Sequence, residues 1–202
     1  MFVWITALAL SSFAGAPRIP VCVAVAPSVP ARVLKLALDE AEAIWRSADV
    51  AIEWHVTTCD RDSASRLSVQ IGDETPPLSS ANKQVLGWIL FTAPSVPVPR
   101  IIVSQAAVGQ LMDRQEQYRE EPAALREIRL SRAIGRALAH EIGHYLLRSS
   151  VHPPAGLMRA THTSSDLFAI NRGGFDLTAE EARIAAREVD RLVGHVGGGA
   201  SR

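Results

Sequence analysis

The sequence predicts a single domain of the α+β class, with a small twisted mixed sheet and helices packed against it. Its 202 residues suit one domain that is large enough to bury a substantial core. Short segments of alternating hydrophobicity fill the first half of the chain, and longer segments of helical period fill the second half. Because no repeat or linker separates the halves, we expect one domain over 17–196, followed by a flexible tail at 197–202.

Composition and charge limit the classes of function. Hydrophobic residues make up 48% of the chain and charged residues 21%, a balance typical of a folded soluble protein. Lys+Arg and Asp+Glu both count 21, so the net charge gives no indication of a nucleic-acid partner. We expect no membrane span in the domain, and the sequence does not indicate an oligomeric state.

The first half of the chain is expected to contribute one helix and several strands. Residues 21–25 form a short apolar segment typical of a buried strand. A helix follows from about Ser28, with Pro30 in its first turn. Alternation then predicts strands at 52–57 and 67–71. The apolar stripe of the helix comprises Leu34, Leu38, Ala41, Ile44, Trp45 and Ala48.

Two more strands are expected on either side of a proline-rich loop. One covers 85–91 and is interrupted by Gly87, and the other covers 101–104. The loop between them is indicated by Pro94, Pro97 and Pro99.

The second half of the chain is expected to be helical. A short helix is predicted over 105–117, and a long one begins at Pro122 and ends near Arg148. Thr178 and Glu181 form a capping box that opens a final helix. Three arginines share one arc of the long helix, opposite its apolar side, and are expected to face solvent. They are Arg129, Arg132 and Arg136.

The N-terminus predicts export. Residues 1–16 form an uncharged apolar run that ends in Ala14-Gly15-Ala16, a cleavage pattern of small residues. We therefore expect a signal peptide and a secreted or periplasmic protein, which would be cytoplasmic if this segment is not a signal. In an oxidising compartment Cys22 and Cys59 could form a disulfide, and the alternative is two buried free thiols.

The most informative motif lies near the end of the long helix. His140, Glu141 and His144 form an HExxH sequence. Histidines four residues apart lie about 40° apart around a helix, so both imidazoles can reach one metal ion. Glu141 lies beside them, where a carboxylate can take a proton from water at the metal. The motif therefore predicts a Zn²⁺ site of a hydrolytic enzyme.

A catalytic zinc site needs a third protein ligand, because zinc prefers four ligands and one position is kept for water. His152 lies eight residues after His144, beyond a segment that can end the helix and fold the chain back. Pro153 and Pro154 follow it and disfavour helix. The other candidates are His162, Asp166, Glu180 and Glu181.

Residues 139–159 resemble the active-site stretch of the metzincin clan of zinc metallopeptidases. The resemblance implies a zincin-like domain in which His140, His144 and His152 are ligands and Glu141 is the general base. Met158 would be the methionine of a tight turn beneath the metal. The resemblance also implies a peptide or protein substrate, whose backbone pairs with a strand before the motif helix, here 85–91.

The sequence departs from the clan pattern HExxHxxGxxH at two positions. Leu147 stands at the glycine position and Ser150 at the third-ligand position, so that His152 is displaced by two residues. No residue is assigned to stabilise an oxyanion, although Tyr145 and Arg159 are nearby.

Two alternatives stay open from the sequence. The chain also resembles the glutamate zincins, in particular the cytosolic repressor-cleaving peptidases, in which a glutamate of a later helix is the third ligand. Glu180 or Glu181 would have that role here. The other alternative is a non-catalytic zinc-binding or interaction domain, which would have no need for a carboxylate at Glu141.

Overall fold

A computed structural model of the chain describes residues 18–57, 59, 67–77 and 84–197. The strands in these ranges are β1 (Arg18–Val25), β2 (Ala51–Val56), β3 (Leu67–Gly72), β4 (Gly87–Ala93) and β5 (Val96–Ser104). The helices are α1 (Ala31–Arg46), α2 (Gln105–Asp113), α3 (Glu116–Arg119), α4 (Ala123–Leu147), α5 (Ser164–Phe168) and α6 (Ala179–Gly197). The predicted signal peptide, residues 1–16, lies outside the described residues, as does all of the predicted tail except Gly197.

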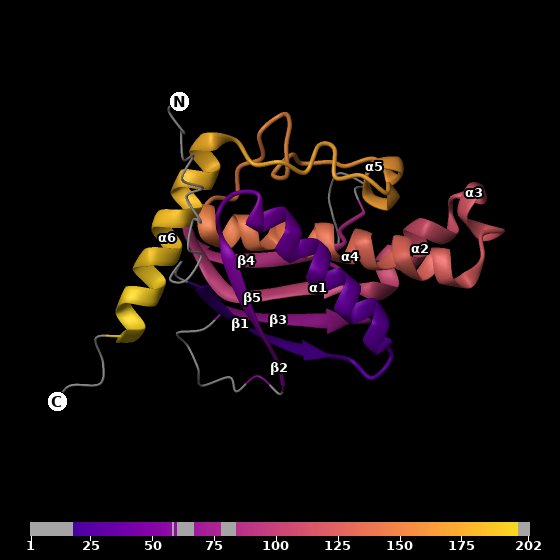
Figure 1. Cartoon of the computed structure of the whole chain (residues 1–202), viewed down its shortest axis with the longest axis horizontal. Helices are drawn as coiled ribbons and strands as arrows, with labels where there is room; N and C mark the ends of the chain where they lie inside the picture. The colour runs from indigo at the N-terminus through magenta and orange to yellow at the C-terminus, as the bar shows by residue number, and fades with distance from the viewer. Residues whose placement is uncertain (1–17, 58, 60–66, 78–83, 198–202) are drawn as a thin grey trace, which may run out of the picture.

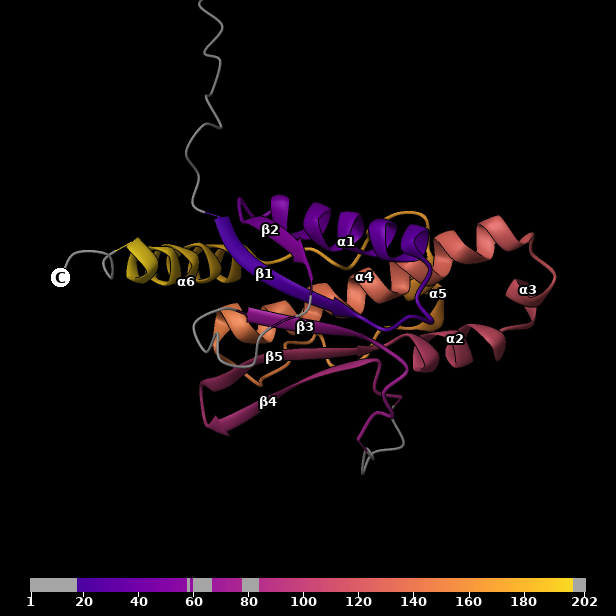
Figure 2. The same cartoon turned by 90° about the horizontal axis from the view of Figure 1, so that it is seen from below.

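The strands form one mixed sheet in the order β2-β1-β3-β5-β4 (Figures 1 and 2). β1 is parallel to β2 and to β3, and β3 is parallel to β5. β4 is antiparallel to β5 and forms one edge of the sheet. The predicted α+β class, single domain and mixed sheet are therefore confirmed.

Helices α1 and α4 lie side by side along the sheet, with α4 on the β4–β5 half (Figure 2). Their close approach depends on Gly135, where a Cβ atom would lie 2.5 Å from the Ala37 carbonyl oxygen. The Trp45 indole, which is fully buried, donates to the Ala139 carbonyl oxygen at 3.2 Å. These contacts fix the position of α4, the helix of the HExxH motif.

Arg136 is buried, so the prediction that it faces solvent is wrong. Its side chain is 1% exposed, and its Nε donates to Glu40 of α1 at 2.9 Å. Its other nitrogens donate to the carbonyl oxygens of Asp166, Leu167 and Asn171. The helical period could not show this, because the partners come from α1 and from a segment thirty or more residues later.

The bounds of β4 and β5 differ from the predicted ones. β4 begins and ends two residues later than the predicted strand 85–91, and β5 extends the predicted strand 101–104 toward the N-terminus. The strand expected at 101–104 begins at Val96, so Pro97 and Pro99 lie inside β5 and not in a loop. Proline is tolerated there because β5 pairs with β3 only from Arg100 onward, and its pairing with β4 contains register shifts. The helix expected at 105–117 is divided into α2 and α3.

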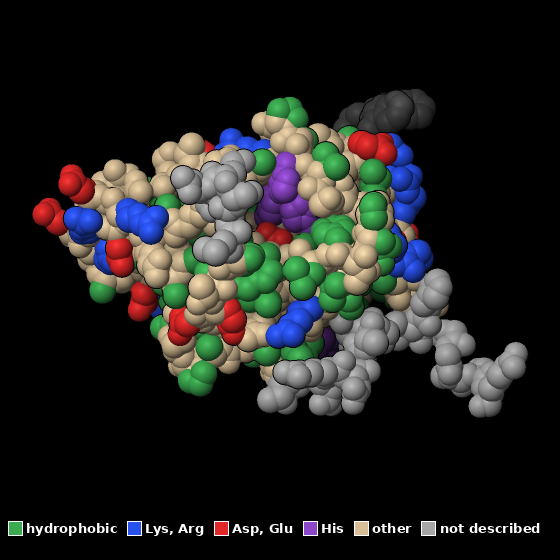
Figure 3. Space-filling view, turned by 180° about the vertical axis from the view of Figure 1, so that it is seen from behind, with side chains coloured by type: hydrophobic (Ala, Val, Ile, Leu, Met, Phe, Trp, Pro, Cys, Tyr) green, Lys and Arg blue, Asp and Glu red, His purple; other side chains and the backbone are tan. Residues whose placement is uncertain are grey.

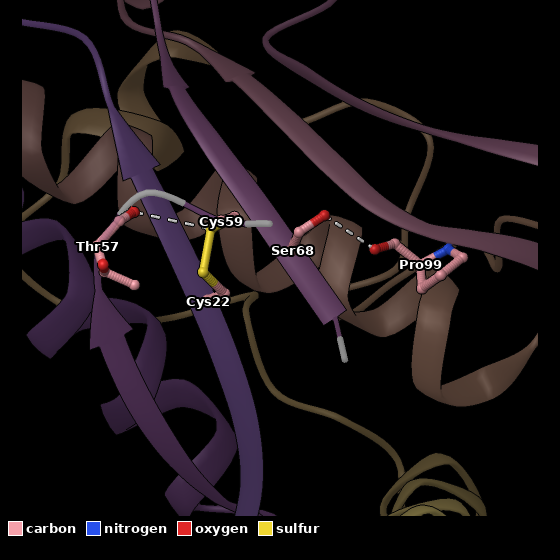
Figure 4. The surroundings of a disulfide bond; sticks show 5 residues. All are labelled: Cys22, Thr57, Cys59, Ser68 and Pro99. Atoms are coloured by element: carbon pink, nitrogen blue, oxygen red, sulfur yellow. Dashed lines mark hydrogen bonds between the residues drawn. A yellow bond between two sulfur atoms is a disulfide. The ribbon is translucent and has the colours of Figure 1, made fainter. Parts of the chain in front are cut away.

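Cys22 and Cys59 form a disulfide whose Cα atoms are 5.8 Å apart (Figure 4). The alternative of two free thiols is therefore wrong. The bond joins β1 to the segment that follows β2. Next to it, Ser68 of β3 donates to the Pro99 carbonyl oxygen of β5 at 3.1 Å. Within the described part of the chain, no helix is long and apolar enough to cross a membrane.

Candidate metal centre

The chain reverses directly after the HExxH motif. α4 ends at Leu147, and Arg148 adopts a left-handed conformation with φ 50° and ψ 41°. The Arg148 N–H donates back to the carbonyls of His144 and Tyr145, and the Ser149 N–H donates to His144 at 3.3 Å. This reversal returns the following segment to the helix and brings His152 beside the motif histidines.

Three histidine side chains converge at this place. The Nε2 atom of His144 lies 3.1 Å from that of His140 and 3.2 Å from that of His152. One nitrogen from each ring lies within 4.8 Å of the others, which is close enough for one metal ion. Figure 3 shows histidine side chains gathered in a hollow on this face of the molecule, beside acidic atoms.

Backbone carbonyls fix the tautomers of two of these rings. His140 Nδ1 lies 2.9 Å from the Leu157 carbonyl oxygen, and His144 Nδ1 lies 2.6 Å from that of Ser149. A carbonyl oxygen only accepts, so both Nδ1 atoms carry the proton and the Nε2 lone pairs remain available. Two such lone pairs at 3.1 Å repel one another unless a cation lies between them.

The electrostatics of the site favour neutral rings. Burial, together with the neighbouring His144, lowers the pKa of His140 to about 3. Burial also lowers the pKa of His144. Metal ligation requires neutral imidazole, so these rings fit zinc without the loss of a proton at neutral pH.

Glu141 lies beside the histidines and is 7% exposed. Burial raises the pKa of its carboxyl group to about 8. Gly87, the first residue of β4, packs against it, and a Cβ atom at Gly87 would lie 3.0 Å from Glu141 Cγ. The sequence predicted that Gly87 would interrupt this strand. Instead Gly87 begins β4 and, because it has no side chain, lets the strand approach Glu141.

Met158 packs beneath the motif helix. It is 1% exposed, and a Cβ atom built on Gly143 would lie only 2.2 Å from its sulfur. Glycine is therefore the residue that fits between His140 and His144 on this side of α4. The HExxH pattern leaves position 143 open, so the sequence alone did not indicate the packing role of Gly143.

The other candidate ligands do not join the three histidines. His162 donates to the Leu157 carbonyl oxygen, and Asp166 pairs with Arg159 at 2.5 Å. Glu181 accepts from the Thr178 N–H at 2.8 Å, so the predicted capping box is formed. Glu180 pairs with Arg183.

A cavity of about 650 Å³ opens onto the histidines. β4 and the residues just before it line one side, and the segment that follows Met158 lines the other. The predicted strand 85–91 therefore borders this site, although its regular part begins at Gly87. Apolar side chains form much of the lining: Trp88, Ile89, Phe91, Leu111, Leu167 and Phe175.

Among solved structures, the chain is similar to the crystal structure of archaemetzincin from Methanopyrus kandleri. The TM-score is 0.50, and the match covers 87% of this chain and 97% of the other at 14% sequence identity. At this identity the likeness shows a shared fold. No protein-family model matches the chain, and no curated protein sequence matches it.

Proposed function

We propose that this protein is a zinc-dependent endopeptidase. The observation that carries the proposal is the convergence of His140, His144 and His152 beside the buried carboxyl group of Glu141. Because the Nδ1 atoms of His140 and His144 donate to carbonyls, their Nε2 lone pairs are available for one cation, and His152 Nε2 lies 3.2 Å from that of His144. Three imidazoles with an open fourth position are the donor set of catalytic zinc sites.

His140, His144 and His152 would hold the metal. Zinc, when bound, supplies a Lewis acid that polarises the scissile carbonyl and lowers the pKa of water. Glu141, as a carboxylate, accepts the proton from the attacking water and delivers it to the nitrogen of the leaving amine. A cation held by the neighbouring histidines would favour this charged form, which burial alone disfavours. β4 and the segment after Met158 line the cavity in which this transfer would take place.

Two features support a metzincin-like enzyme over a glutamate zincin. The left-handed turn at Arg148 reverses the chain directly after the motif helix, so that His152 reaches the motif histidines although it lies two residues beyond the third-ligand position of the clan pattern. Glu181 is engaged in the cap of α6 and Glu180 with Arg183. The fold shared with a protein named archaemetzincin agrees with this assignment.

The proposed substrate is an extended peptide. β4 is an edge strand, so a peptide can pair with its free backbone groups while side chains enter the apolar cavity. We also propose that the enzyme acts outside the cytoplasm, and the Cys22–Cys59 disulfide supports this because such bonds persist in oxidising compartments.

The test compares zinc content and peptide hydrolysis in two variants. Glu141→Gln keeps a polar side chain that cannot accept the proton, so about one zinc per chain is expected with hydrolysis reduced by at least about 100-fold. His152→Ala is expected to lose both zinc and activity. Hydrolysis unchanged in Glu141→Gln would contradict the mechanism. Zinc binding without hydrolysis of any peptide in a diverse library would favour the non-catalytic alternative.

A further inference from the structure

His162 lies next to His140, one of the proposed metal ligands, and both rings contact the same hydrogen-bond acceptor. The Leu157 carbonyl oxygen lies 2.9 Å from His140 Nδ1 and 3.1 Å from His162 Nε2. The two rings are in edge contact, with centroids 6.3 Å apart and planes at 90°. One backbone oxygen therefore links a metal-site histidine to a second histidine that is not itself in the group of three.

The tautomer of His162 follows from its partner on the other side. Arg159 Nε lies 2.9 Å from His162 Nδ1. A guanidinium only donates, so Nδ1 accepts and the ring proton is on Nε2, which faces Leu157. His162 is therefore the donor to the Leu157 carbonyl oxygen, and both lone pairs of that oxygen are used.

Three contacts hold the His162 ring in this orientation. It stacks on Phe175, with centroids 4.4 Å apart and planes at 9°. Arg159 is held by Asp166 at 2.5 Å, and Asp166 in turn accepts from the Thr163 N–H at 2.9 Å. The donor is thus fixed by α5 and its cap and does not depend on a flexible side chain.

We propose that His162 is a positioning residue for zinc binding, which acts through the Leu157 carbonyl oxygen on His140. With two donors on one oxygen, the carbonyl cannot rotate away, and His140 keeps its proton on Nδ1 and its Nε2 lone pair toward the metal. Residues that orient the metal ligands through hydrogen bonds, without binding the metal themselves, alter metal affinity by about 10–100-fold. The proposal rests on the proposed zinc site, and it assigns no contact with substrate to His162.

Two substitutions separate the hydrogen bond from packing. His162→Phe keeps an aromatic ring for stacking on Phe175 but removes the donor. His162→Gln removes the ring but retains an amide N–H at about the position of Nε2. His55→Phe is the matched control, because it removes an exposed histidine of β2 outside the metal group.

Zinc affinity is measured by competition with a chelator on the full-length protein, starting from metal-stripped samples. His162→Phe is expected to bind zinc about 10–100-fold more weakly than wild type, with His162→Gln within about threefold of wild type and His55→Phe unchanged. The absorption spectrum of the cobalt-substituted protein should change in His162→Phe alone. In metal-free protein, ¹⁵N shifts of the His140 ring should report Nδ1–H in wild type and a tautomer mixture in His162→Phe.

The results of these measurements decide whether His162 acts through its hydrogen bond or only through packing. The proposal is overturned if His162→Phe binds zinc as tightly as wild type, or if the Phe and Gln variants are weakened equally. If His162→Phe fails to fold, His162→Gln must still keep wild-type affinity and cobalt spectrum, and its failure to do so overturns the proposal. A wild-type protein that binds no zinc would instead refute the proposed function.

Discussion

At the scale of single residues, the burial of the Glu141 carboxyl group should lower stability at neutral and higher pH. Its folded pKa of about 8 exceeds the ordinary value of 4.5, so the unfolded chain loses this proton at lower pH. In metal-free protein the contribution of Glu141 to the unfolding free energy should therefore fall as pH rises from 4.5 to 8, and Glu141→Gln should lack this contribution. The lowered pKa values of His140 and His144 act in the opposite direction in both proteins, so the test is the difference between wild type and variant. The variant should match wild type near pH 4.5 and be more stable by roughly 2–5 kcal/mol near pH 8.

Urea unfolding of both metal-free proteins at several pH values measures this difference. A stability difference that stays constant between pH 4.5 and 8 would show that burial does not control the Glu141 carboxyl group.

Gly143 gives a second prediction at the same scale. A methyl group there would overlap the Met158 sulfur, at 2.2 Å, so Gly143→Ala must displace the turn beneath the helix. We expect a loss of about 1–3 kcal/mol of unfolding free energy and weaker zinc binding. Gly143→Ala combined with Met158→Ala should recover part of the zinc affinity, and Gly109→Ala, where no atom lies within 4 Å, is the control. Equal stability of Gly143→Ala and wild type would contradict the packing described.

At the scale of elements, the end of α4 decides where the third histidine lies. Arg148 has a φ of 50°, a conformation that costs a residue with a side chain about 1–2 kcal/mol. Its ion pair with Glu188 is long, at 3.5 Å, and the Arg148 side chain is 43% exposed, so the pair offsets little of this cost. Arg148→Gly should therefore raise the unfolding free energy by about 0.5–1 kcal/mol with unchanged zinc affinity, as measured by thermal unfolding and zinc competition. A destabilised Arg148→Gly variant would mean that the side chain holds the turn.

The same elements show what the sequence could and could not predict. The HExxH helix, the capping box of α6 and the α+β class were readable because each depends on residues close together in the chain. The His140–Leu157 hydrogen bond and the Met158–Gly143 contact join residues fifteen or more positions apart, and no local period reports them. The boundaries of β5 were wrong because Pro97 and Pro99 were taken as loop residues, although their positions do not pair with β3.

At the scale of the whole molecule, Arg136 of α4 forms hydrogen bonds with α1 and with the segment that follows Met158. It joins α4 to Glu40 of α1 and to the carbonyls that follow the Met158 turn, and its guanidinium lies 4.6 Å from the Phe175 ring centroid. Arg136→Met should cost about 3–5 kcal/mol, because the buried Glu40 loses its buried partner and keeps the half-exposed Arg172, while three carbonyl oxygens lose their donor. Arg132→Met, one turn away on α4, should cost less than about 1 kcal/mol. Chemical unfolding of both variants measures the difference, and equal losses would show that Arg136 is not the specific link.

The proposed function depends on one metal position, formed by residues from the motif helix and from the segment that returns to it. Anomalous diffraction at the zinc edge, from crystals of the zinc-loaded protein, locates that position directly. We expect a single strong peak within about 2.0–2.1 Å of the Nε2 atoms of His140, His144 and His152, with Glu141 close by and not bound. A peak coordinated by Glu180 or Glu181, or no zinc at the three histidines, would contradict it.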